Sequence, residues 1–176
     1  MKLTILFVVT FFILSNGFSQ KNYATKSAQV KFFSHTPAED IEAINNQAVS
    51  KLIDNTGQVV FSLLIKGFRF ENELMQEHFN GPDYMNSTQF PKGEFKGTIV
   101  NIAAVNFTKD GTYNVTTNGD LTIKGITKKV TTKGTVTIVK GNVSTKSIFK
   151  INVKDFGVNS SEVAKDLEIT VTAKYD

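Results

Sequence analysis

Apolar and polar residues alternate through most of the second half of the chain, and this pattern restricts the fold more than any other feature. Small or apolar residues occupy every second position in 95–99, 113–123, 130–138, 147–153 and 167–173. The intervening positions carry mainly Lys, Thr, Asn and Glu. Successive side chains of a β-strand point to opposite faces, so the pattern predicts an antiparallel sheet with one buried and one wet face.

Turn residues divide these strands. Lys109-Asp-Gly111 predicts a hairpin turn, and Lys124–Thr127 and Lys140–Asn142 predict two more, whereas 155–158 is irregular. In the first half, 23–34 predicts an opening strand that Pro37 ends. A turn at 55–58 precedes a strand with Val59, Phe61, Leu63 and Ile65 on one face, which Gly67 interrupts.

Residues 38–53 are ambiguous. Ile41, Ile44 and Ala48 have helical spacing, but the segment also fits two short strands around a turn at Asn45-Asn46. We expect the two strands. The resulting eight or nine short strands predict a sandwich or a closed barrel. The chain has 176 residues, enough for one domain with a sizeable core.

Residues 73–80 alone do not fit a strand. Leu74, Met75, His78 and Phe79 fall at i, i+1, i+4 and i+5, which predicts one face of a short helix. Asn72 or Glu73 can begin it, and Gly81-Pro82 can end it. Such a helix is either a lid for a barrel or a packed connector.

Three glycines, Gly97, Gly119 and Gly134, fall at inward positions in the middle of predicted strands. They mark bends where the sheet curls, or leave room for a ligand, and the two interpretations are compatible.

Residues 1–19 are typical of a signal peptide. Lys2 precedes an apolar stretch over 3–14, and small residues at Gly17 and Ser19 favour cleavage after Ser19. We therefore expect a mature domain over 20–176, soluble in the periplasm or secreted. The full chain has a formal net charge of +4, and removal of Lys2 with the signal peptide lowers the net charge to +3. The charges are interspersed, which argues against nucleic acid and favours at most peripheral membrane contact.

The residues for catalysis or metal binding are sparse. The chain has no cysteine and two histidines, His35 and His78, with no spacing that gathers metal ligands. No serine lies in a nucleophile elbow, and no glycine-rich phosphate loop precedes a helix. The sequence therefore predicts no metal, no cofactor and no enzymatic activity, and a hydrolase or isomerase is the least favoured function.

Three motifs resemble those of the YceI-like family of bacterial lipid-binding proteins. The first is His78-Phe-Asn-Gly-Pro-Asp-Tyr-Met-Asn-Ser-Thr-Gln-Phe-Pro91 followed by Phe95. The second combines 113–115 with Gly119-Asp-Leu-Thr-Ile-Lys-Gly-Ile-Thr-Lys128, and the third is Asp155-Phe-Gly157. Many members carry Arg-Asp where this chain has Met75-Gln76, so any role of that charged pair in placing the helix or a head group is not carried over.

The resemblance implies a single eight-stranded antiparallel, lipocalin-like barrel with one short helix, exported to the periplasm and holding a long apolar chain such as a polyisoprenoid. We expect Leu74, Met75 and Phe79 to close one end and touch an isoprenoid or fatty-acyl ligand, with His78 bracing the loop by hydrogen bonding. The full expected binding set is Phe61, Leu63, Ile65, Phe68, Leu74, Met75, His78, Phe79, Tyr84, Phe95, Ile99, Leu121 and Phe149. The expected role is storage or transport, and the alternative is a structural or stress-response barrel with a filled core. Oligomeric state is left open, with a homodimer as one arrangement.

Overall fold

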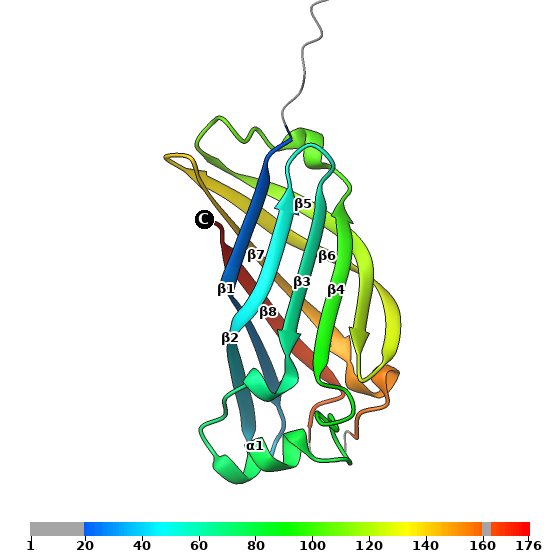
Figure 1. Ribbon diagram of the computed structural model, residues 1–176. Coiled ribbons are helices and arrows are strands. Elements are labelled where there is room, and N and C mark those ends of the chain that lie inside the picture. Colours follow the sequence, from blue (N-terminus) through cyan, green and yellow to red (C-terminus); the bar gives the residue numbers. More distant parts are fainter. Residues whose placement is uncertain (1–19, 160–162) are drawn as a thin grey trace, which may run out of the picture.

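Eight antiparallel strands and one short helix make up the fold in a computed structural model that describes residues 20–159 and 163–176 (Figure 1). The predicted signal peptide lies outside the described residues. The strands are β1 (Asn22–His35), β2 (Asp40–Ile53), β3 (Gln58–Leu64), β4 (Lys92–Ile99), β5 (Gly111–Ile123), β6 (Ile126–Val139), β7 (Asn142–Asn152) and β8 (Asp166–Lys174). The helix α1 spans Glu73–Asn80, and short 3-10 turns form at η1 (Ile65–Gly67), η2 (Ile102–Ala104) and η3 (Val153–Phe156).

Each strand pairs with the next, and β1 pairs with β8, so the sheet closes into a barrel. The closing pairs include Val30 opposite Val171 and Phe32 opposite Ile169, which are apolar residues on the inner face. Closure gives each of the eight strands a hydrogen-bonded neighbour on both sides. The predicted eight-stranded barrel is therefore confirmed, and the sandwich is excluded.

The two strands predicted around Asn45-Asn46 are one continuous strand, β2, so that prediction is wrong. The β1–β2 pairing shifts register between Ala28 and Val30, which places a bulge at this point of β2. Asn45 is fully buried: its side-chain nitrogen donates to the Leu64 carbonyl (2.9 Å), and its oxygen accepts from Gln47 N (2.9 Å). These hydrogen bonds satisfy the buried side chain of Asn45 within the bulge. The strand therefore continues through Asn45-Asn46, and no turn forms there.

The predicted turns before β6 and β7 are confirmed as two-residue hairpins. Lys124 and Gly125 have φ of 49° and 77°, and Lys140 and Gly141 have φ of 50° and 79°. Positive φ at both positions matches the right-handed twist of the paired strands, and glycine adopts it without strain.

The hairpin predicted at Lys109–Gly111 is wrong, because residues 100–110 form a longer connection that contains η2. β5 is longer than β4, so Ile99 at the end of β4 already lies opposite Thr117. Beyond the end of β4, the side chain of Asn101 supplies hydrogen bonds to the backbone of β5. It donates to the Asn114 carbonyl (3.0 Å) and accepts from Thr116 N (2.9 Å).

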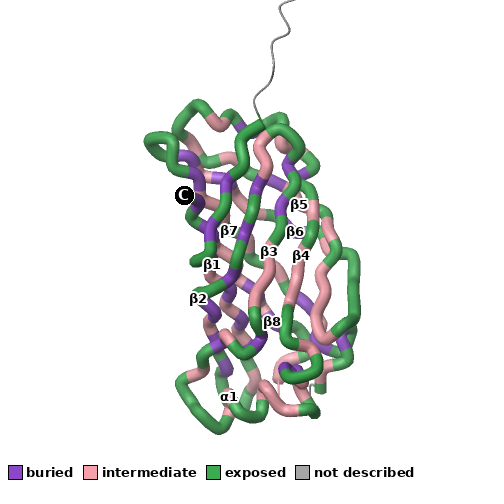
Figure 2. Tube along the Cα trace, in the orientation of Figure 1, coloured by how far each residue is buried: buried purple, intermediate pink, exposed green. Residues whose placement is uncertain are grey.

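The barrel is packed solid at the end away from α1, where buried positions recur on several strands (Figure 2). Leu52, Ile138 and Val143 are at most 2% exposed there. Tyr23 stacks on Phe107 with a centroid distance of 5.5 Å and closes this end. We call this region the filled end and the opposite one the α1 end.

A buried phenol lies at the filled end. The Tyr175 hydroxyl bonds to the Ser50 hydroxyl (2.9 Å) and more weakly to that of Thr145 (3.5 Å). Burial raises the pKa of the Tyr175 phenol, and these two hydrogen bonds oppose that rise. The fold therefore favours the neutral phenol.

Tyr175 should make the barrel sensitive to alkali. Its stabilising contribution is complete below the unfolded-state pKa of about 10 and is lost as pH rises through the higher folded-state pKa. Between pH 8 and pH 11, the unfolding free energy of the wild type should therefore fall more than that of Tyr175→Phe. Urea denaturation at the two pH values measures both losses, and equal losses would contradict the assignment.

The mid-strand glycines allow close backbone contacts and leave no vacant space at two of the three positions. Gly97 lies opposite Gly119 in the β4–β5 pairing. A Cβ on either residue would lie 2.5 or 2.6 Å from the tip of the Phe95 ring, and one on Gly134 would lie 2.4 Å from the Lys146 carbonyl. Tight curling of the sheet is thus the main role of these glycines, and Phe95 fills the space that we considered for a ligand at Gly97 and Gly119.

Candidate functional site

An apolar cavity of about 220 Å³ occupies the inside of the barrel between the α1 end and the filled end. Seven of the eight strands, all except β2, contribute side chains or backbone to its wall, together with α1, η3 and the segments beside them. Ten of the expected binding residues line it: Phe61, Leu63, Ile65, Phe68, Phe79, Tyr84, Phe95, Ile99, Leu121 and Phe149. Their contact with a ligand stays a prediction.

The period-2 pattern placed the barrel residues on the correct face. Phe61 lies opposite Phe95, and Phe95 lies opposite Leu121, so three inward residues form a row across β3, β4 and β5. Further along the wall, Phe149 lies opposite Ile169. Large apolar side chains from neighbouring strands thus meet at the same height of the barrel and form a continuous apolar surface.

Helix α1 begins and ends where the sequence predicts. The Asn72 side chain accepts hydrogen bonds from Leu74 N (2.9 Å) and Met75 N (3.3 Å), and Gly81 follows the last turn. In Figure 1 the helix lies across one end of the barrel, below β1, β2 and β3.

The helix face that contacts the barrel differs from the prediction at two residues. Leu74 is 58% exposed and His78 is also exposed, and neither lines the cavity. Met75 and Phe79 are partly buried against the core, but only Phe79 reaches the cavity. With about 100° between successive residues, the 75/79 pair points inward and the 74/78 pair points away.

Four phenylalanine rings join α1 to the barrel. Phe79 lies 5.6 Å from Phe32, 5.6 Å from Phe68 and 5.0 Å from Phe70, measured between ring centroids. Such spacings are favourable for tilted and stacked aromatic pairs. The cluster of Phe32, Phe68, Phe70 and Phe79, which we call the aromatic cluster, holds the helix in place. Phe32 and Phe70 were not among the expected site residues.

The loop after α1 is held by backbone groups and not by His78. Met85 N donates to the Phe79 carbonyl (3.1 Å) and Ser87 N to the Asn80 carbonyl (3.1 Å). Within the described residues, the His78 side chain has no hydrogen bond, so the predicted brace is wrong. This geometry buries Met85, which lines the cavity and which the sequence analysis missed.

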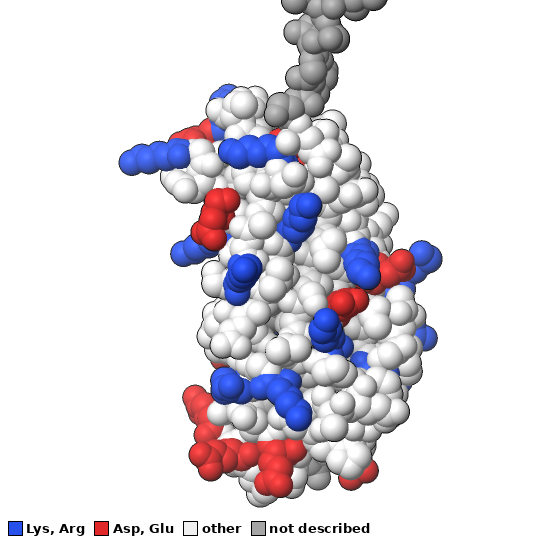
Figure 3. Space-filling model, in the orientation of Figure 1, with Lys and Arg blue, Asp and Glu red and all other residues white. Residues whose placement is uncertain are grey.

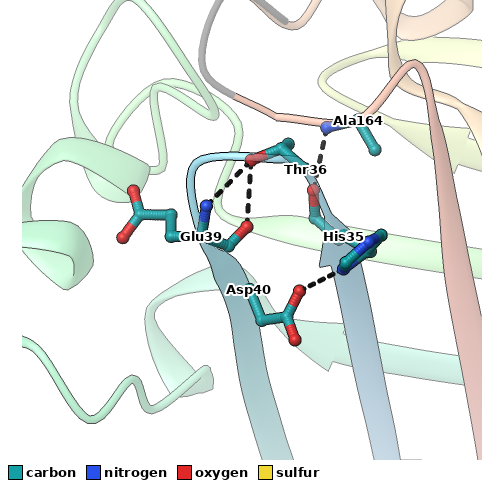
Figure 4. Close-up of polar contacts among 6 residues, drawn as sticks. His35, Thr36, Glu39, Asp40 and Ala164 are labelled. Carbon is teal, nitrogen blue, oxygen red and sulfur yellow. Dashed lines mark hydrogen bonds and ion pairs between the residues drawn. The ribbon is translucent and has the colours of Figure 1, made fainter.

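The other side of the α1 end is anchored by the turn between β1 and β2 (Figure 4). The Ser34 hydroxyl is fully buried and accepts a hydrogen bond from Ala164 N (2.8 Å). Thr36 closes the turn by donating from its hydroxyl to the Glu39 carbonyl (2.9 Å). The bond to Ala164 positions its neighbour Val163, a further cavity residue without a sequence signal.

The inward-facing wall of the cavity carries no charge among the described residues. Glu94 and Lys146 touch the cavity, but both occupy outward positions of their strands, and Glu94 forms an ion pair with Lys96 (3.5 Å) on the outer surface. Figure 3 shows charged side chains spread over the outside, with acidic ones at the α1 end. In the described residues, no three His, Cys, Asp or Glu side chains gather as metal ligands. None of the described helices is long and apolar enough to span a bilayer.

Comparison with known proteins adds to this geometry. The family model of the YceI-like domain matches residues 19–175. None of the curated proteins matches the chain.

Several solved structures share the fold. A polyisoprenoid binding domain from Saccharophagus degradans, implicated in plant cell wall breakdown, has a TM-score of 0.76 at 7% identity, covering 88% of this chain and 97% of that one. Burkholderia cenocepacia BcnA has a TM-score of 0.62 at 18% identity, covering 83% and 96%. A Campylobacter jejuni YCEI protein has a TM-score of 0.59 at 15% identity, covering 100% and 99%.

These likenesses show a shared barrel, and the family match extends over nearly the whole described chain. Most of the motif residues that carried the resemblance lie around the α1 end of the barrel, at α1 and its loop, at the β5–β6 hairpin and at η3, whereas residues 113–115 lie near the start of β5. The chain belongs to the YceI-like family.

Proposed function

We propose that this protein binds a long apolar molecule, such as an isoprenoid lipid, inside the barrel and serves as an exported storage or transport protein. The observation that carries the proposal is the apolar cavity inside the barrel, whose wall is rich in aromatic residues and has no charged residue among the inward positions that line it. Transferring an apolar chain from water into such a space gains about 0.8 kcal/mol per methylene. A chain of many methylenes therefore binds without a catalytic or ionic group.

Two further observations support this function over a structural barrel with a filled core. The filled end shows that inward side chains of this protein can pack without a cavity, yet the α1 half retains one. The structural neighbour from Saccharophagus degradans is described as a polyisoprenoid binding domain. Export rests on the signal-peptide pattern of residues 1–19.

Binding can be tested with the mature chain, residues 20–176. Lipids extracted after purification from its own host should contain a prenyl-chain lipid by mass spectrometry. The delipidated protein should increase the fluorescence of N-phenyl-1-naphthylamine saturably, at one site, and geranylgeraniol should displace the probe. A folded, delipidated protein that shows no saturable binding would favour the structural barrel.

A further inference from the structure

Two hydroxyl groups face the apolar cavity without a partner. Thr117 on β5 lies opposite Thr132 on β6, and both line the cavity. Thr132 is only 7% exposed. Within the described part of the chain, neither hydroxyl makes a hydrogen bond. Thr132 is buried and Thr117 half-buried, and a hydroxyl in apolar surroundings without a partner is unfavourable, so this pair needs an explanation.

The same two strands show what threonine pairs do on the outer face. Thr112 and Thr137 lie opposite each other, with their hydroxyl oxygens 3.1 Å apart, and those of Thr122 and Thr127 are 2.8 Å apart. Cross-strand threonines commonly satisfy each other in this way. The inner pair also lies directly opposite in the β5–β6 ladder, but it is a hydrogen-bonded pair, in which the two side chains lie farther apart than in the outer pairs. Both inner hydroxyls therefore stay free to bond to something in the cavity.

The inner pair, which we call the Thr117–Thr132 pair, lies deep in the barrel. Each member is six positions from the β5–β6 hairpin at the α1 end, about 20 Å along its strand. Beyond it, Val115 and Val136 lead into the filled end. Because Phe79 and Tyr84 line the cavity at the α1 end, a chain inserted from that end would reach the pair with its leading atoms.

The residues around the Thr117–Thr132 pair determine which polar group of a ligand can bind there. Val115 and Gly119 flank Thr117 on the inner face, and no described inward residue that lines the cavity is charged. Lys128 shares this face of β6 but is exposed beside the β5–β6 hairpin. A carboxylate or phosphate here would be desolvated without a counter-ion, which is strongly unfavourable. An alcohol or carbonyl oxygen would instead give both hydroxyls a partner at little desolvation cost.

We propose that the Thr117–Thr132 pair binds an uncharged oxygen at the leading end of the apolar ligand, which enters the barrel polar end first. This inference rests on the proposed function and adds a ligand class and an orientation. The cavity should therefore bind long-chain alcohols and ketones with higher affinity than hydrocarbons of equal length or anionic lipids.

The test compares geranylgeraniol, the hydrocarbon with the same chain but no hydroxyl, and geranylgeranyl phosphate, each displacing N-phenyl-1-naphthylamine from the mature protein. Wild type should bind the alcohol most tightly. In Thr117→Val/Thr132→Val, which keeps the side-chain shape but removes both hydroxyls, affinity for the alcohol should fall about fivefold or more. Affinity for the hydrocarbon should stay the same or rise.

The matched control is Thr112→Val/Thr137→Val, which removes the outer pair from the same strands and should leave all three affinities unchanged. Thermal unfolding of each variant checks that the barrel is intact. If the inner double variant loses affinity for alcohol and hydrocarbon alike, or if the phosphate binds as tightly as the alcohol, the pair is not a polar subsite although the cavity binds lipid. A wild type that binds none of the three overturns both this inference and the proposed function.

Discussion

Replacing Ile138 with aspartate is expected to unfold the barrel. Ile138 is 1% exposed at the filled end, belongs to the hydrophobic core together with Val136 and Val143, and does not line the cavity. Burying a carboxylate in such a place costs several kcal/mol, a large share of the roughly 5–15 kcal/mol that stabilises a typical domain. Urea denaturation followed by far-ultraviolet circular dichroism would show the loss.

The matched control is the next residue. Val139 is 54% exposed on the outer face, so Val139→Asp should change the unfolding free energy by less than about 0.5 kcal/mol. Similar stabilities for the two variants would mean that the inward and outward faces of β6 have been assigned wrongly.

Truncating Phe79 to alanine should weaken ligand binding at least tenfold, about 1.4 kcal/mol. Phe79 lines the cavity and is the α1 ring of the aromatic cluster, so its loss opens the cavity wall and frees the helix from three ring contacts. The strands pair independently of α1, so far-ultraviolet circular dichroism should retain the barrel signal. Displacement of N-phenyl-1-naphthylamine by geranylgeraniol measures the affinity.

Leu74→Ala is the control on the same helix, because Leu74 is exposed and does not touch the cavity. Its affinity should equal that of the wild type. Normal binding by a folded Phe79→Ala variant would remove α1 from the binding site, and global unfolding of that variant would identify the aromatic cluster as structural core.

The strand segments, and the face of the sheet that each of their side chains occupies, could be predicted because both depend on the local alternation of apolar and polar residues. The alternation that includes Phe95, Leu121 and Phe149 specifies which side chains point inward, and the barrel confirms each of them. Helix α1 was also predictable, because Asn72 and Gly81 are local signals for its two ends. Its inward face was not fully predictable, since Leu74 and Met75 are both apolar and tertiary packing selects between them.

Other features depend on groups distant in sequence. Asn45 supports a bulge only because the Leu64 carbonyl lies beside it, so the local preference of Asn for turns misled the prediction. The position of Val163 depends on Ser34, about 130 residues earlier in the chain. The cavity could not be predicted from the sequence either. Alternation predicts which side chains point inward, but not whether those from opposite walls of the barrel fill the space between them.

The pairing of β1 with β8 has a consequence for how the protein folds. Gln29 meets Thr172 in this pair, so the first strand cannot complete its hydrogen bonds until the last strand has been made. Contacts between such remote segments require closure of a very long loop, which makes folding slow relative to helical proteins. Until closure, β1 exposes an open strand edge that could recruit other chains. During this interval the nascent barrel is most vulnerable to aggregation, and circular permutation that joins the termini and opens the β4–β5 connection would transfer this vulnerability to β4 and β5.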